Sequence, residues 1–311
     1  MHFLFSLAAL LVLVHPLLAA RTATSSPPSN RIIERQAPPN TIATRFPDAE
    51  TASLNLTFFV LPAPIAVAKQ IAGEFALLSS FRERLPASVS ATPRLGKESI
   101  LCSSWRTTAL RFTTIYAPAP IVIPELSEVQ TFAGFVDCTG DGSTACFRQY
   151  AGYFDQLVFA LLGNVFAATR LFGGTLNPPH SPYKPLGSGR YGLNVSDAVG
   201  GLLGAGRPYI SSFTFATSSE GLSGELAQEL LDAPLVRSLD NRCFKSIYFF
   251  NETTTPIRNI VGDVDVRSPL VPSQGLASQR LATENVQGVT AAVQRKVTTQ
   301  SVKCSTYAKA A

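Results

Sequence analysis

The sequence predicts a single α+β domain that occupies residues 41–269. Several runs of β-branched and aromatic residues, separated by proline or glycine, are typical of strands, and 209–217 (YISSFTFAT) is one of them. The apolar run 154–168 is too long for one strand and indicates a buried helix that contains Gly163. Neither an internal repeat nor a linker divides residues 40–266. With 311 residues, 46% of them hydrophobic and 15% charged, the chain can form a sizeable core.

The stretch 129–185 carries the clearest local pattern. Residues 129–137 predict a strand, and Gly140-Asp141-Gly142 predicts a tight turn after it. Residues 147–150 predict the returning strand, which leads into the helix of 154–168. A proline-rich loop, 178–185, ends this stretch.

The remaining elements are short and are separated by proline and glycine. Residues 86–94 predict a loop, and residues 187–206 are rich in glycine and only weakly patterned. Further helices are expected at 65–75 and at 222–231, with Ser223 as N-cap of the second. Further strands are expected at 54–61, 99–103, 108–116, 209–217, 242–250 and 257–266.

Both ends of the chain differ in composition from the domain. Residues 1–20 are apolar and end in Ala19-Ala20, which predicts a cleaved signal peptide, with an uncleaved membrane anchor as the alternative. Residues 21–40 predict a disordered segment. Residues 270–311 are polar and predict a C-terminal segment beyond the domain, held by a disulfide. We therefore expect a secreted, extracellular protein without stable membrane insertion.

Five cysteines are present, and an oxidising compartment favours pairing them. Cys138 and Cys146 flank one turn and are expected to form a disulfide. Cys243 and Cys304 are the second expected pair, which leaves Cys102 over. The spacings contain no C-x-x-C and no histidine partner, so no metal site is predicted.

Three N-x-S/T motifs agree with an exported chain. They begin at Asn55, Asn194 and Asn251, and a glycan on any of them requires an exposed asparagine.

The formal net charge of +5 is spread along the chain. No basic cluster with interleaved aromatic residues is present, so a nucleic-acid partner is not expected. Ordinary solvation explains the charge more simply than adhesion to acidic polymers does.

Histidine limits the catalytic chemistry. Removal of residues 1–20 takes away His2 and His15 and leaves His180, so a site with two histidine ligands is excluded within one chain. No G-x-S-x-G motif is present either. His180 lies in the proline-rich loop, where an exposed histidine is favoured and a catalytic one is the alternative.

Asp137 and Asp141 suggest a calcium loop at first sight. Thr139 and Arg148 stand where the third and twelfth ligands would be, so turn formation explains the two aspartates better. Nothing selects a carboxylate pair for glycoside hydrolysis, and Trp105 is the single tryptophan for sugar stacking.

Arg148 and Tyr150 share one face of the predicted hairpin with the paired cysteines, because side chains alternate along a strand. This face is either wetted by solvent or lines a cavity in which arginine holds a carboxylate.

The middle of the chain resembles acetoacetate decarboxylase-like proteins. The likeness covers Ile123-Pro124-Glu125, the strand to Asp137, Phe147-Arg148-Gln149-Tyr150, the helix through Gly163, the unit 54–75 and the loop 178–184. It implies an antiparallel, cone-like β-barrel with a few flanking helices around a small-molecule cavity.

The resemblance also implies a Schiff-base lysine, activated by a neighbouring lysine just after the helix. The corresponding region offers Val165, Thr169 and Arg170, and no Lys-Lys pair occurs in the chain. Lys184 is the nearest substitute, and its loop position favours a solvated lysine.

These observations lead to three hypotheses. The first is a secreted glycoprotein, without cofactor, that binds a small apolar or carboxylate-bearing molecule and does not form a Schiff base. The second is an enzyme on the same scaffold that uses Arg148, Tyr150, His180 or Lys184. The third is a structural glycoprotein of the cell wall.

Overall fold

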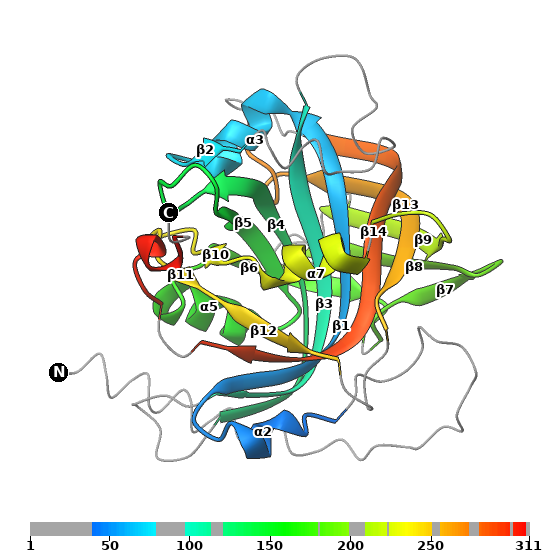
Figure 1. Ribbon diagram of the computed structural model, residues 1–311. Coiled ribbons are helices and arrows are strands. Elements are labelled where there is room, and N and C mark those ends of the chain that lie inside the picture. The colour runs from blue at the N-terminus through cyan, green and yellow to red at the C-terminus, as the bar shows by residue number, and fades with distance from the viewer. Residues whose placement is uncertain are drawn as a thin grey trace. The chain divides into compact units, whose positions relative to one another are not determined.

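The computed structural model describes most of the chain (Figure 1). The described residues are 39–78, 97–112, 121–179, 181–198, 209–222, 224–250, 256–273, 280–298 and 301–308. The predicted signal peptide, the segment up to residue 38, His180 and Asn251 lie outside them.

One mixed sheet dominates the structure, accompanied by short helices. The helices are α2 (Ile42–Arg45), α3 (Ile65–Ala72), α5 (Leu157–Phe166), α7 (Gly224–Asp232) and the 3-10 turn η2 (Cys304–Tyr307). The strands are β1 (Glu50–Pro64), β2 (Ala76–Leu77), β3 (Lys97–Phe112), β4 (Ile121–Asp137), β5 (Ala145–Phe154), β6 (Leu171–Asn177), β7 (Lys184–Gly187), β8 (Arg190–Asp197), β9 (Ser211–Thr217), β10 (Leu235–Val236), β11 (Cys243–Phe244), β12 (Ser246–Phe249), β13 (Arg258–Arg267) and β14 (Arg280–Val297).

The strands pair in the order β11-β10-β5-β6-β8-β9-β13-β14-β1-β3-β4-β2. In addition, β12 pairs with β14, β7 with β8, and β4 with β5. The pairs β5–β6 and β5–β10 are parallel, whereas the other described pairs are antiparallel. The α+β class is therefore confirmed, but the sheet is mixed and the expected purely antiparallel barrel is not.

The long strands bury both faces, which explains their nearly continuous apolar runs. Along β1, Phe59 and Leu61 join a core with α3, which we call the α3-side core. The alternate residues Leu56 and Phe58 join a second core with α7, the α7-side core. Figure 1 shows α7 lying over β1 and β3. Alternation thus assigns successive apolar residues of β1 to the two cores in turn.

The helix predicted at 154–168 is shorter than expected. Strand β5 continues to Phe154, and α5 begins only at Leu157. Similarly, the weakly patterned residues 187–206 contain β8, and the strand expected at 242–250 is divided into β11 and β12. Glycine and polar residues conceal strands whose stability comes from pairing rather than from propensity.

The prediction of a polar C-terminal segment outside the domain is wrong. Strand β14 extends from Arg280 to Val297 and pairs with β1, β12 and β13. Its second half is buried, including Val293 and Gln294 at 0% exposure. Polar residues such as Gln294 misled the composition argument, because here they lie in the interior and are hydrogen-bonded.

The two expected disulfides are confirmed: Cys138 pairs with Cys146, and Cys243 pairs with Cys304. The second disulfide holds η2 against β11, as expected for the end of the chain.

Asn55 is a poor glycan acceptor in this fold. It lies in the middle of β1 with 8% of its surface exposed, so its burial contradicts the predicted use of this motif. Asn194, in β8, is partly exposed, and it stays a predicted acceptor.

Among the described helices, none is long and apolar enough to cross a bilayer.

The close approach of the β1 backbone to β14 requires a glycine at position 288. A Cβ atom at this position would lie 2.2 Å from the carbonyl oxygen of Phe58 on β1. We expect Gly288→Ala to lower the free energy of unfolding in urea by about 3 kcal/mol, because the two strands must separate.

Gly224→Ala is the matched control, since a Cβ atom there meets nothing within 4 Å. Its effect should stay within about 0.5 kcal/mol. Equal stabilities of the two variants would contradict the tight β1–β14 approach.

Candidate functional site

Of the sequence-predicted site residues, the structure describes Arg148, Tyr150 and Lys184, whereas His180 lies outside the described residues. Arg148 donates from Nη1 to the carbonyl oxygen of Ile71 at 2.7 Å and from Nη2 to that of Ser238 at 3.3 Å. Its guanidinium group therefore holds the end of α3. Lys184 is exposed at the start of β7.

Tyr150 contacts Arg170, a residue that was not among the predicted cavity residues. Arg170 donates from Nη1 to the Tyr150 hydroxyl at 3.1 Å, and its guanidinium carbon lies 5.2 Å from the centre of the Tyr150 ring. This pair joins β5 to the start of β6, which favours a structural role for both side chains.

A shift in the pairing register of the β4–β5 hairpin explains why the cysteines and Tyr150 have other surroundings than predicted. The register between β4 and β5 changes between Ala133 and Val136, and Phe135 has a φ of 57°. The bulge places Ala133 and Val136 together in the α3-side core, whereas simple alternation predicts opposite faces. The cysteines and Tyr150 therefore face packed side chains.

The α3-side core is filled by aromatic rings. Phe59 stacks on Phe213 at 5.9 Å between centroids, and Tyr183 meets Phe215 edge-on at 4.8 Å. The Tyr183 hydroxyl donates to Thr57 within this core. Aromatic side chains therefore pack this face of the sheet.

A buried polar cluster lies on the α7 side of the sheet. We call it the Glu128 cluster, and it consists of Glu128 and Gln130 of β4, Gln149 of β5, Tyr248 of β12 and Arg295 of β14. All five residues are at most 9% exposed. Glu128 and Gln130 alternate with Val129, so they share the face of Phe132.

A directed chain of hydrogen bonds runs through the cluster. Gln149 Nε2 donates to Gln130 Oε1 at 3.0 Å, and Gln130 Nε2 donates to Glu128 Oε2 at 2.9 Å. At its beginning, Gln149 Oε1 is buried and finds no hydrogen-bond partner within the described part of the chain. An unsatisfied buried acceptor is costly, so this oxygen is suited to a donor from a water or a ligand.

Burial raises the pKa of Glu128 from 4.5 to about 7. Arg295 and the hydrogen bond from Gln130 oppose this rise, whereas the charges of Glu50 and Asp155 reinforce it. A carboxyl group with a pKa near 7 can both accept and release a proton under physiological conditions.

Arg295 and Tyr248 complete the cluster from the C-terminal part of the chain. They lie directly opposite each other in the β12–β14 pair, and Arg295 Nη2 binds Glu50 Oε1 at 3.0 Å. Burial raises the pKa of Tyr248, which keeps its hydroxyl protonated at neutral pH.

An apolar pocket lies on the same face of the sheet as the Glu128 cluster. Tyr248 contributes to its wall, and so do Phe132, which follows Gln130 by two residues, and Phe147, which precedes Gln149 by two residues. Its volume is about 30 Å³, which is room for a single water molecule. The other lining residues are Leu56, Phe58, Leu230, Leu231, Ala233 and Leu235.

Sequence reasoning missed the Glu128 cluster, although one signal was present. Glu128 and Gln130 interrupt an apolar, β-prone run, and a charged residue inside a strand that is buried on both faces needs a partner. Arg295 and Tyr248, however, reach the cluster only through long-range pairing.

No family model matches the chain, and no curated protein matches it in sequence. Solved structures do resemble it. The enduracididine biosynthesis enzyme MppR complexed with pyruvate has 13% sequence identity and a TM-score of 0.49, covering 84% of this chain and 91% of its own.

Two further solved structures also resemble this chain. The acetoacetate decarboxylase of Legionella pneumophila has 11% identity and a TM-score of 0.38, with 93% of this chain and 96% of its own covered. An acetoacetate decarboxylase-like enzyme of Sphingomonas wittichii has 14% identity and a TM-score of 0.40, with 82% and 92% covered. The solved structures that this chain resembles therefore include acetoacetate decarboxylases and an acetoacetate decarboxylase-like enzyme, the family that the sequence resemblance named.

The raised pKa of Glu128 predicts how stability changes with pH. A carboxyl group whose pKa is raised by folding stabilises the protein fully below its unfolded pKa and loses that contribution as pH rises through the folded pKa. Between the ordinary value of 4.5 and about 7, the wild type should therefore lose about 3 kcal/mol of unfolding free energy through this group.

Glu128→Gln should flatten this dependence and be the more stable protein at pH 8, as measured by urea unfolding from pH 4 to pH 8.5. Glu225→Gln, on the exposed first turn of α7, is the control and should follow the wild type. Parallel curves for wild type and Glu128→Gln would disprove the burial of an ionisable Glu128.

Proposed function

We propose that this chain binds a small organic molecule at the Glu128 cluster, on an acetoacetate decarboxylase-like scaffold and without a Schiff-base lysine. The observation that carries the proposal is the buried Gln149 Oε1, which begins the chain of hydrogen bonds to Glu128 and finds no donor in the described part of the protein. Its neighbourhood combines an apolar wall with a few convergent polar groups, which is the usual composition of ligand sites.

The geometry favours an apolar ligand with one N–H or O–H donor over a carboxylate-bearing one. The donor would bind Gln149 Oε1, and the apolar body would lie against Phe132 and Phe147. Arg148, the arginine expected to hold a carboxylate, already binds backbone carbonyls, and Arg295 of the Glu128 cluster binds Glu50.

Entry of such a ligand requires a movement of α7. The pocket of about 30 Å³ is far smaller than an organic molecule, and Leu230 and Leu231 of α7 close it. Helix α7 is nine residues long, and its apolar side supplies the contacts that would be exchanged for the ligand.

The strand pairing supports a rolled, cone-like sheet for this scaffold. Strand β5 pairs with β6 and also with β4, and these two strands lie near opposite ends of the pairing order. Export to the extracellular space remains part of the proposal, with which the two disulfides are compatible. N-terminal sequencing of the mature protein tests it, and a chain beginning near Arg21 is expected.

The second candidate function is an enzyme that transfers a proton. It is favoured by one observation, the pKa of about 7 for Glu128 beside the Tyr248 hydroxyl and the Arg295 cation. Glu128→Gln would then abolish turnover without abolishing binding, since the glutamine preserves the shape of the site.

Phenol and toluene are suitable probes, because they share an apolar ring and differ in one donor. We expect ligand-observed NMR to show that wild type binds phenol more tightly than toluene. Gln149→Leu should weaken phenol binding about tenfold, because one hydrogen bond to a buried group is lost.

Gln228→Leu, on α7 outside the cluster, is the matched control and should bind phenol like the wild type. Benzoate tests the carboxylate-bearing alternative. Equal phenol affinities of wild type and Gln149→Leu would refute this site.

Treatment with acetoacetate and borohydride tests the absence of Schiff-base chemistry. We expect no reduced lysine adduct by mass spectrometry, because an ordinary lysine with a pKa near 10.4 is about one part in a thousand neutral at pH 7. A single-site adduct that disappears on replacing that lysine by arginine would make decarboxylation the leading hypothesis.

A further inference from the structure

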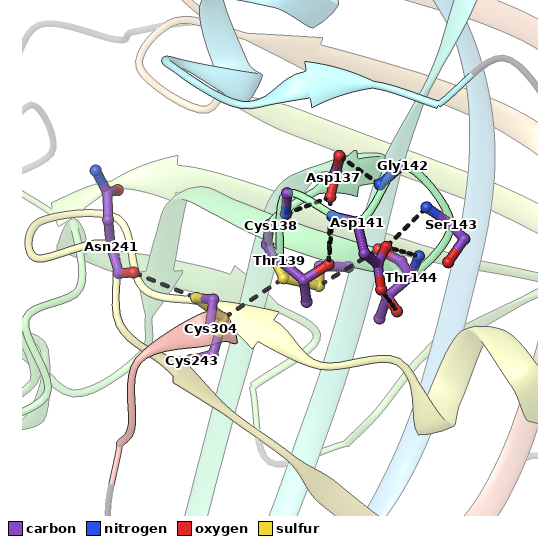
Figure 2. Close-up of a disulfide and its surroundings, with 12 residues drawn as sticks. Asp137, Cys138, Thr139, Asp141, Gly142, Ser143, Thr144, Asn241, Cys243 and Cys304 are labelled. Carbon is purple, nitrogen blue, oxygen red and sulfur yellow. Dashed lines mark hydrogen bonds between the residues drawn. A yellow bond between two sulfur atoms is a disulfide. The ribbon is translucent and has the colours of Figure 1, made fainter. Parts of the chain in front are cut away.

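The two disulfides are in contact with each other. Cys138 Sγ lies 3.7 Å from Cys243 Sγ, although each atom is bonded to a different partner (Figure 2). The sulfur atoms of Cys138, Cys243 and Cys304 all lie within 4.8 Å of one another. Four cysteines from three distant parts of the chain therefore form one sulfur cluster.

The loop between Cys138 and Cys146 does not depend on its disulfide. Asp137 carboxylate oxygens accept from the backbone N–H of Gly140 at 2.7 Å and of Gly142 at 2.9 Å. Asp141 Oδ1 accepts from the N–H groups of Ser143 and Thr144, both at 2.7 Å. Figure 2 shows these bonds closing the loop, so the loop can keep its conformation when the sulfur bond moves.

The segment around Cys304 is also held independently of its disulfide. Cys243 and Val302 exchange two backbone hydrogen bonds of 2.9 and 2.8 Å. Arg237 Nη1 donates to Ser301 Oγ at 2.9 Å, and Arg242 Nε donates to the Ser301 carbonyl oxygen at 3.1 Å. Opening the Cys243–Cys304 bond therefore leaves Cys243 beside Cys138.

We propose that this cluster is a thiol-exchange site that takes a small-molecule thiol at Cys304 and passes the exchange on to Cys146. The thiolate attacks Cys304 Sγ, forms a mixed disulfide and releases Cys243 as a thiolate. Cys243 then attacks Cys138 Sγ, forms a Cys138–Cys243 disulfide and releases Cys146, which takes up one proton. Two disulfides exist before and two after, and one thiol is exchanged for another, so no oxidant or reductant is needed.

The local geometry sets the direction of these steps. Within the Cys243–Cys304 disulfide, Cys304 is 7% exposed and Cys243 is fully buried, so a thiol that attacks this bond meets Cys304 first. The Thr144 carbonyl oxygen lies 3.9 Å from Cys146 Sγ and can accept a hydrogen bond from the released thiol. The second step needs only a short approach of two sulfur atoms that already touch.

Glutathione is the probe for the wild-type protein. Under native conditions it should give a protein with one glutathione on Cys304, a Cys138–Cys243 disulfide and, in addition to the unpaired Cys102, a free thiol on Cys146. Acid quenching, alkylation and peptide mapping without reduction identify all three. Glutathionylated protein whose free thiol is Cys243, or no reaction at all, would overturn the proposal.

A pair of variants tests the second step alone. Both are made with Cys102→Ser, so that only the four cluster cysteines are considered. Cys304→Ser leaves Cys243 without its partner, and we expect a substantial share of molecules with Cys138–Cys243 paired and Cys146 alkylated. In the matched control, Cys243→Ser, the sulfur in contact with Cys138 is absent, so Cys138–Cys146 should stay intact and Cys304 be alkylated.

A Cys304→Ser protein that keeps Cys138–Cys146 and alkylates at Cys243 contradicts the exchange. Circular dichroism shows whether each variant is folded. If Cys304→Ser does not fold, the glutathione experiment on the wild type decides between the two outcomes.

Discussion

The pairing of β1 with β14 is the constraint on which the rest of the structure depends. It joins residues far apart in sequence over ten consecutive pairs, from Glu50 and Val297 to Phe59 and Gly288. Gly288 permits this approach, because its Cα lies against the Phe58 carbonyl. Once these strands are joined, the alternate residues of β1 face the α3-side and α7-side cores.

This pairing also assembles the candidate site. Arg295 of β14 binds Glu50 at the start of β1, and β12 pairs with β14 so that Tyr248 lies opposite Arg295. Glu128 reaches the same place from β4, and its charge interacts with that of Arg295. The burial that raises the Glu128 pKa is therefore a property of four strands together, and no single strand creates it.

The two faces of the sheet differ in packing and polarity. On the α3 side, stacked aromatic rings and the contact between the two disulfides fill the interior. On the α7 side, polar groups are buried, and Gln149 Oε1 has no hydrogen-bond partner within the described part of the chain. A packed face stabilises the fold, whereas an incompletely satisfied polar face is where binding free energy can be gained.

Local patterns were sufficient for much of this protein. Alternation and turn residues predicted β1, α3 and the β4–β5 hairpin, and the resemblance to acetoacetate decarboxylase-like proteins agreed with the structural comparisons. The cysteine positions also predicted both disulfides. These features depend on neighbours in sequence or on a small number of possible pairings.

The sequence by itself therefore determined β1, α3, the β4–β5 hairpin, the disulfide pairs and the absence of a lysine pair, but not β8 or β14. The tertiary structure decided the role of each side chain. It removed Arg148 from the candidate site by bonding it to Ile71, buried Asn55, and placed Glu128 near Arg295. A bulge of a few residues or the pairing of two distant strands changes which groups meet, and no local pattern records either one.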